Sequence, residues 1–189
     1  KTELTPEWQK IRKVIDPATL EYEEAQKPEL PCLAAAKKAK TLPEKMQAIV
    51  YGEDKGAKFA WKAVAHNLIY AANRIPEISD TIIEIDNAMK WGFNFEMGPF
   101  ETWDAIGLRK SVARMEDDGL EVPQKVKNML AGGCESFYKI ENGRRYYYDF
   151  AGETYREQLI NKNIVSLPAL KFTGQVVKEN DSVSLIDLG

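Results

Sequence analysis

The chain has 189 residues, and a hydrophobic share of 44% is enough for one packed domain of ordinary size with extensions. Its formal net charge of −3 disfavours nucleic acid as a partner. No apolar run approaches the roughly twenty residues that span a bilayer, and no leader opens the chain, so we expect a cytoplasmic protein without a membrane partner. Cys32 and Cys134 stand alone and are expected to be reduced thiols, and a single histidine, His66, argues against a zinc site.

The first thirty residues are predicted to be a linker. They carry Pro6, Pro17 and Pro28, dense charge and few apolar anchors. The acidic run at 21–24 is better explained as a solvated face than as a metal cage, because nothing there spaces ligands around a cation.

A helical domain is predicted over residues 31–163. Pro31 and Pro43 each stand where a short helix can begin, and Gly52 ends the second. Three lysines, Lys37, Lys38 and Lys40, follow in this region. They could meet phosphates, but a solvated helix face explains them better.

The most regular helical spacing runs from Gly56 to Arg74, and Pro76 stops that helix. Its predicted apolar positions are Ala60, Ala63, Val64, Asn67, Leu68, Ala71 and Ile75. His66 is the only side chain whose ordinary pKa suits acid–base chemistry near neutral pH, yet its place on the polar side predicts a solvated residue.

Further helices are punctuated by capping and stop signals. Thr81 and Glu84 form the pattern of a capping box, and the helix they open is expected to stop at Gly92. A polar helix over 109–118 and another opening at Pro123 complete the helical part.

The run from Met89 to Leu108, which we call the signature corner, is the most specific pattern in the chain. Gly92 and Gly98 are expected to free the backbone between two helices, and Pro99 fits the first position of the second helix. The side chains expected to shape the corner, or to dock against another surface, are Phe93, Phe95, Met97, Phe100, Trp103 and Asp104. For Asp104 we favour a role as acceptor for nearby backbone N–H groups over a contact across a domain joint.

A β-hairpin is predicted near residues 137–148. Asn142-Gly143 separates two β-prone runs, which is the strongest short-range hairpin signal. Tyrosines beside Arg144 and Arg145 could form a base-stacking surface, but cross-strand packing fits the acidic chain better.

The signature corner resembles that of the C-terminal helical domain of 3-hydroxyacyl-CoA dehydrogenases, and the likeness is strongest from Phe59 to Asp104. The hairpin and the arms resemble those of larger β-oxidation proteins that carry an enoyl-CoA hydratase on the same polypeptide. This resemblance implies a mainly α domain with a small hairpin and extended arms. Residues 164–189 would then be a connector and the first strand of a truncated hydratase domain.

The same resemblance argues against catalysis by this segment. Counting back from Asp86, the Asn-Arg pair of the family's catalytic repeat falls on Trp61-Lys62, and tryptophan cannot replace an asparagine amide. The chain also lacks a Gly-x-Gly-x-x-Gly turn for a dinucleotide. We therefore expect no catalytic, cofactor-binding or metal-binding residue here, with NAD bound by another part of the parent protein.

The expected role is that of a non-catalytic repeat that packs against the catalytic part and helps to shape the acyl-CoA cleft. Its partners would be the other domains of the parent chain and acyl-CoA at the joint, and the isolated fragment could self-associate. A stand-alone CoA-binding or acyl-binding module, or a protein-interaction module, is the alternative.

Overall fold

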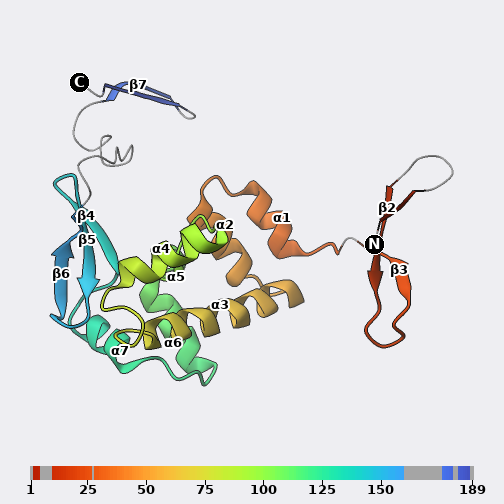
Figure 1. The fold of residues 1–189 in the computed structure, drawn as a ribbon, viewed down its shortest axis with the longest axis horizontal. Coiled ribbons are helices and arrows are strands. Elements are labelled where there is room, and N and C mark those ends of the chain that lie inside the picture. The colour runs from red at the N-terminus through yellow and green to blue at the C-terminus, as the bar shows by residue number, and fades with distance from the viewer. Residues whose placement is uncertain (1, 5–9, 27, 160–175, 181–182, 188–189) are drawn as a thin grey trace.

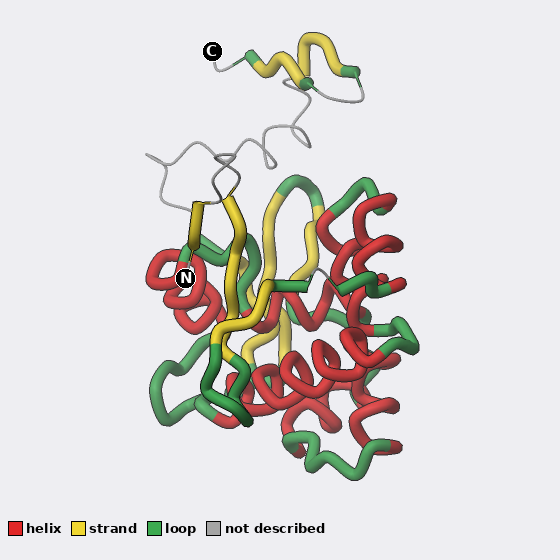
Figure 2. Tube along the Cα trace, turned by 90° about the vertical axis from the view of Figure 1, so that its right-hand side faces the viewer, coloured by secondary structure: helices red, strands yellow, loops and turns green. Residues whose placement is uncertain are grey.

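The computed structural model describes residues 2–4, 10–26, 28–159, 176–180 and 183–187. Helices make up most of the body formed by residues 31–159 (Figures 1 and 2). The helices are α1 Pro31–Lys38, α2 Leu42–Val50, α3 Lys55–Asn73, α4 Ile82–Phe93, α5 Pro99–Ile106, α6 Leu108–Asp117 and α7 Gln124–Ala131. The predicted mainly α class is confirmed.

The helix boundaries follow local sequence signals. Thr41 caps α2 in a full capping box with Glu44, while the Asp54 carboxylate accepts the N–H groups of Gly56 and Ala57 at the start of α3. Thr81 caps α4 by accepting the N–H of Ile83. The expected stop after α6 is also present, since Gly119 has a φ of +73°.

One antiparallel sheet belongs to the helical body, in the order β4 Tyr138–Glu141, β5 Arg144–Asp149, β6 Thr154–Glu157. The predicted turn is confirmed, because Asn142 and Gly143 both have positive φ, 50° and 74°. Cross-strand packing is also found: Tyr148 pairs with Tyr155, and their ring centroids lie 5.6 Å apart. The third strand, β6, was not predicted.

Both arms contain short strands. Within the predicted linker, β1 Thr2–Leu4, β2 Lys10–Ile15 and β3 Tyr22–Glu24 form an antiparallel sheet, which the proline and charge pattern did not indicate. At the other end β7 Val176–Glu179 pairs with β8 Ser184–Ile186. The predicted connector over 164–175 and the domain boundary at 163 lie outside the described residues.

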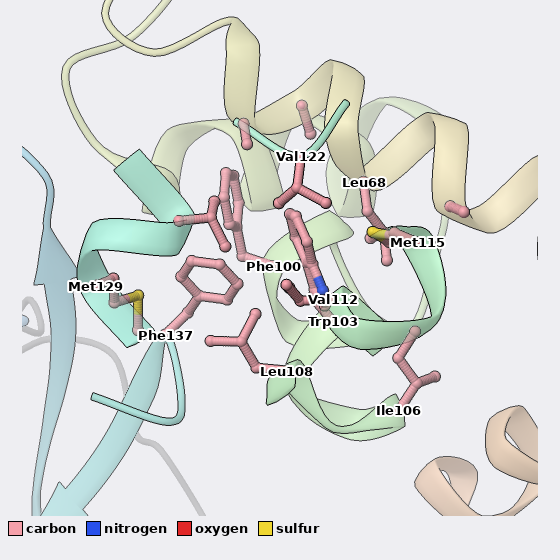
Figure 3. Packing of buried hydrophobic residues seen from close by; sticks show 14 of the residues in the cluster. Leu68, Phe100, Trp103, Ile106, Leu108, Val112, Met115, Val122, Met129 and Phe137 are labelled. Carbon is pink, nitrogen blue, oxygen red and sulfur yellow. The ribbon is translucent and has the colours of Figure 1, made fainter. Parts of the chain in front are cut away.

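The hydrophobic core lies where α3, α5, α6 and α7 meet the edge of the sheet (Figure 3). Phe100 and Trp103 are completely buried and pack on Phe137, at ring-centroid distances of 4.9 and 5.4 Å. Ile106 joins them in the core.

The buried face of α3 agrees with the predicted one only in part, since Leu68 and Ala71 are buried as predicted. The side chains buried along this helix are Ala57, Trp61, Ala65, Leu68, Ala71 and Ala72. Ala63 and Asn67, which were expected inside, are exposed. Small apolar residues surround most of this helix, so their spacing did not single out the face that carries the large Trp61 side chain.

Candidate functional site

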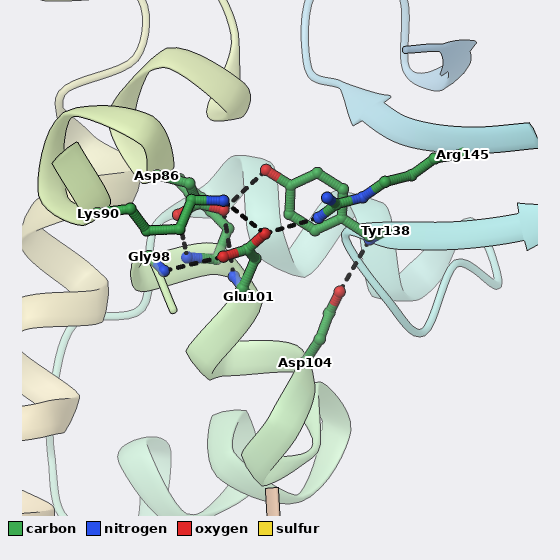
Figure 4. Close-up of polar contacts among 8 residues, drawn as sticks. Asp86, Lys90, Gly98, Glu101, Asp104, Tyr138 and Arg145 are labelled. Carbon is green, nitrogen blue, oxygen red and sulfur yellow. Dashed lines mark hydrogen bonds and ion pairs between the residues drawn. The ribbon is translucent and has the colours of Figure 1, made fainter. Parts of the chain in front are cut away.

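The inner side of the signature corner is organised by Asp86, a fully buried carboxylate on α4 (Figure 4). Its Oδ1 accepts the N–H of Phe100 at 2.8 Å, and its Oδ2 accepts the N–H of Glu101 at 3.2 Å. The hydroxyl of Tyr138 donates to the same Oδ2 at 2.7 Å. Asp86 thus supplies acceptors to the first turn of α5, where backbone N–H groups have no partner within the helix.

Glu101 forms a second polar centre beside Asp86. It accepts the Gly98 N–H at 3.0 Å and pairs with Lys90 at 2.9 Å and Arg145 at 2.7 Å, so it links α4, α5 and the sheet. Burial raises the pKa of Glu101, but hydrogen bonds from Arg145, the Gly98 N–H and Lys90 outweigh it and lower the pKa overall.

Asp104 fastens β4 to α5. Its two carboxylate oxygens accept the N–H groups of Phe137 and Tyr138 at 2.7 and 2.8 Å. The favoured prediction for Asp104, an acceptor of backbone N–H groups, is confirmed.

Both aspartates are held in a poorly hydrated environment. Burial raises the pKa of Asp86 to about 6, with the nearby charge of Glu101 adding to the effect and donors such as Tyr138 opposing it. Burial likewise raises the pKa of Asp104 to about 7, against two backbone donors that lower it. Such pKa values also occur in catalytic acids. Here, however, every oxygen of both carboxylates accepts a donor from the fold itself, so the arrangement stabilises the corner.

The two glycines of the corner differ in what they do. Gly98 has an ordinary φ of −76°, and glycine is needed there because a Cβ would lie 2.3 Å from the Cα and Oδ1 of Asp86. Gly92 lies inside α4 with nothing within 4 Å of its added Cβ, and Asn94 takes the left-handed conformation with φ 56°. The prediction that both glycines free the backbone, and that α4 stops at Gly92, was therefore wrong.

The outer side of the corner is an apolar groove of about 470 Å³ between α2, α3 and the loop before α5. It is lined by Leu42, Met46, Ala63, Val64, Asn67, Leu68, Met89, Asn94, Phe95, Glu96, Met97, Pro99 and Thr102. Phe93 and Phe95 are 69% and 52% exposed, whereas Phe100 and Trp103 belong to the core. The large side chains of the corner are thus divided between the inside and the outside.

Trp61 stands where the sequence resemblance predicts the asparagine of the family's catalytic repeat to fall. It is only 4% exposed, and its Nε1 donates to Asp118 Oδ2 at 2.5 Å. The Arg114 guanidinium stacks over its ring at 4.3 Å. No polar group of this side chain is left for a substrate.

The patterns in the sequence did not indicate the roles of five residues in this site, namely Asp86, Lys90, Glu101, Tyr138 and Arg145. One signal could have revealed Asp86, which stands on the apolar stripe of its helix, four residues after the buried Ile82.

In the described part of the chain, no group of three or more His, Cys, Asp or Glu side chains could hold a metal ion. None of the described helices has the length and apolarity needed to cross a membrane.

The chain is similar to one class of known proteins. The model of the family described as "3-hydroxyacyl-CoA dehydrogenase, C-terminal domain" matches residues 59–145, from α3 to the second residue of β5. The chain is also 47% identical, over 175 residues and 93% of its length, to a probable 3-hydroxyacyl-CoA dehydrogenase of Bacillus subtilis (strain 168). It spans 22% of that relative. No solved structure matches the chain significantly. The predicted likeness to this C-terminal domain is confirmed.

Proposed function

We propose that the chain is a non-catalytic central helical domain of a 3-hydroxyacyl-CoA dehydrogenase. Similarity to the C-terminal domain of that family supports the class. The observation that carries the non-catalytic role is Trp61, since a buried indole bonded to Asp118 stands where a reacting asparagine would be expected.

In this proposal the parent protein oxidises L-3-hydroxyacyl-CoA to 3-oxoacyl-CoA with NAD in fatty acid β-oxidation, in the cytoplasm. NAD and the catalytic base belong to another domain of the parent. The chain is a second helical repeat, followed by an enoyl-CoA hydratase domain on the same polypeptide.

The apolar groove and the exposed Phe93 and Phe95 are the surface that we propose packs against the catalytic part. Their exposure in a cluster is typical of an interface. Burial of one large apolar side chain contributes about 1.5–3 kcal/mol, so two or three docked residues suffice to hold domains that are already joined. Packing there would place this domain beside the acyl-CoA cleft.

The proposal that this domain is non-catalytic is tested by an activity assay on residues 1–189. We expect no NADH formation from 3-hydroxyacyl-CoA at several chain lengths and no saturable NAD binding, because a phosphate-binding turn and the reacting asparagine are both missing. The control is the same chain after heat denaturation. Turnover above that control contradicts the non-catalytic assignment.

The proposal that the apolar groove packs against the catalytic part of the parent protein is tested by sedimentation. The isolated chain should self-associate through the groove in place of its missing neighbour, and Phe95→Ser should reduce the association. Ile78→Ser is the matched control, because Ile78 is 67% exposed and does not line the groove. A strictly monomeric chain, or association that both variants leave unchanged, contradicts docking at this surface.

A further inference from the structure

A second cleft, of about 410 Å³, lies between α3 and α6 and shares no lining residue with the apolar groove. We call it the basic cleft. Its polar lining consists of Lys58, Trp61, Lys62, His66, Arg114 and Asp118. Lys58, Lys62 and His66 are spaced four residues apart, which places them on one side of α3.

Positive charge in the basic cleft exceeds negative charge, although the whole chain is acidic. Lys58, Lys62 and Arg114 carry three positive charges, and the only acidic side chain in the lining is Asp118. Among the described residues, neither lysine forms an ion pair, whereas the half-buried Lys127 pairs with Glu116. Two like charges four residues apart destabilise a helix, and a bound anion would remove that repulsion.

Contacts within the protein hold three side chains of the basic cleft in place, namely Arg114, Trp61 and Asp118. Arg114 donates to the Val50 carbonyl at 2.7 Å, and its guanidinium carbon lies 4.3 Å from the centroid of the Trp61 ring. Asp118 accepts from Trp61 Nε1, and its nearest contact with Arg114 Nε is 4.0 Å, longer than a hydrogen bond. The Arg114 guanidinium is therefore held in position, but Asp118 does not accept a hydrogen bond from it.

We propose that the basic cleft binds the phosphate group of a small-molecule ligand. Two mobile ammonium groups and one fixed guanidinium can each donate charge-assisted hydrogen bonds to phosphate oxygens, and the His66 imidazole adds a further donor. The volume of the cleft admits a phosphate together with part of the molecule that carries it.

The proposal of a phosphate site does not depend on the proposed dehydrogenase function. Only its natural source rests on that function: acyl-CoA carries a pyrophosphate and a 3′-phosphate, so its nucleotide end is the candidate in a 3-hydroxyacyl-CoA dehydrogenase. Free inorganic phosphates share the same chemistry and are the other source.

Calorimetric titration of residues 1–189 at physiological ionic strength tests the site, with inorganic pyrophosphate, CoA and dephospho-CoA as probes. The test variant combines Lys58→Ser with Lys62→Ser. The control combines Lys37→Ser with Lys38→Ser, which removes the same charge from an exposed face of α1 and also tests the alternative lysine cluster. Thermal melting of both variants checks that the fold is retained.

We expect pyrophosphate to bind with one-to-one stoichiometry. The test variant should weaken binding about tenfold or more, because charge-assisted hydrogen bonds are lost, while the control changes it less than about twofold. No binding at millimolar pyrophosphate, or equal weakening in both variants, overturns the site. Tighter binding of CoA than of pyrophosphate or dephospho-CoA identifies CoA as the source through its 3′-phosphate. CoA binding no tighter than pyrophosphate overturns CoA as the source, independently of the dehydrogenase assay.

Discussion

Substitution of Gly98 by alanine should destabilise the packing of α4 against α5 in the signature corner. The new Cβ would lie 2.3 Å from the Cα and 2.4 Å from the Cβ of Asp86, atoms that cannot rotate away. Relief requires α4 and α5 to separate. Their separation would lengthen the hydrogen bonds from the Phe100 and Glu101 N–H groups to the Asp86 carboxylate.

Two contributions set the size of the effect. Overpacking a tight contact costs about 1–3 kcal/mol, and each weakened hydrogen bond to a charged group costs up to about 1.5–3 kcal/mol. We therefore expect Gly98→Ala to lower the free energy of unfolding by about 3 kcal/mol, which corresponds to roughly 6–12 °C in Tm.

Gly92→Ala is the matched control, because it makes the same change six residues earlier. Gly92 lies inside α4 with open space around its added Cβ, so alanine should stabilise the helix by about 0.5–1 kcal/mol. Thermal and urea unfolding followed by circular dichroism measure both variants. If Gly98→Ala melts like the unsubstituted chain, or if both substitutions change Tm in the same direction, the steric explanation of Gly98 is wrong.

Two further predictions concern the pH dependence of stability and the hairpin. The pKa values of Asp86 and Asp104, about 6 and 7, lie above their ordinary 3.8, so the folded chain binds protons more tightly than the unfolded one. Its free energy of unfolding should therefore rise by on the order of 2 kcal/mol as pH falls from about 8 to 5.5, and Asp104→Asn should reduce that rise. Melting curves across this range check it, and a Tm that falls equally in both proteins refutes it. Gly143→Val should cost about 1 kcal/mol or more, because valine is strained at a φ of 74°. An unchanged Tm would show that the hairpin does not depend on this turn.

Local signals in the sequence were sufficient for most of the fold. Proline at helix starts, glycine at helix ends and Asn142-Gly143 act through neighbouring backbone atoms, so their effects can be inferred without the tertiary structure. The role of Asp104 could be anticipated for the same reason, since a carboxylate beside an apolar helix face needs donors.

What the sequence left undetermined depends on contacts between distant segments. Gly98 is required by the approach of Asp86 from another helix, and Arg145 meets Glu101 across 44 positions. The interior face of α3 was predicted only in part because alanines occur around most of the helix, and the burial of Trp61 depends on its contact with the distant Asp118. Neither a spacing rule nor a capping rule contains such information.

Tyr138 has a consequence for where the domain can be divided. Its hydroxyl donates to the buried Asp86 and its backbone N–H to the half-buried Asp104, so one residue of the hairpin serves both carboxylates of the helices. A shorter fragment that ended after α7 would remove these donors from both carboxylates. The segment matched by the family model ends at Arg145, the residue that pairs with Glu101. The smallest folding unit should therefore include the first two strands, and amide exchange in β4 should occur only with unfolding of α5.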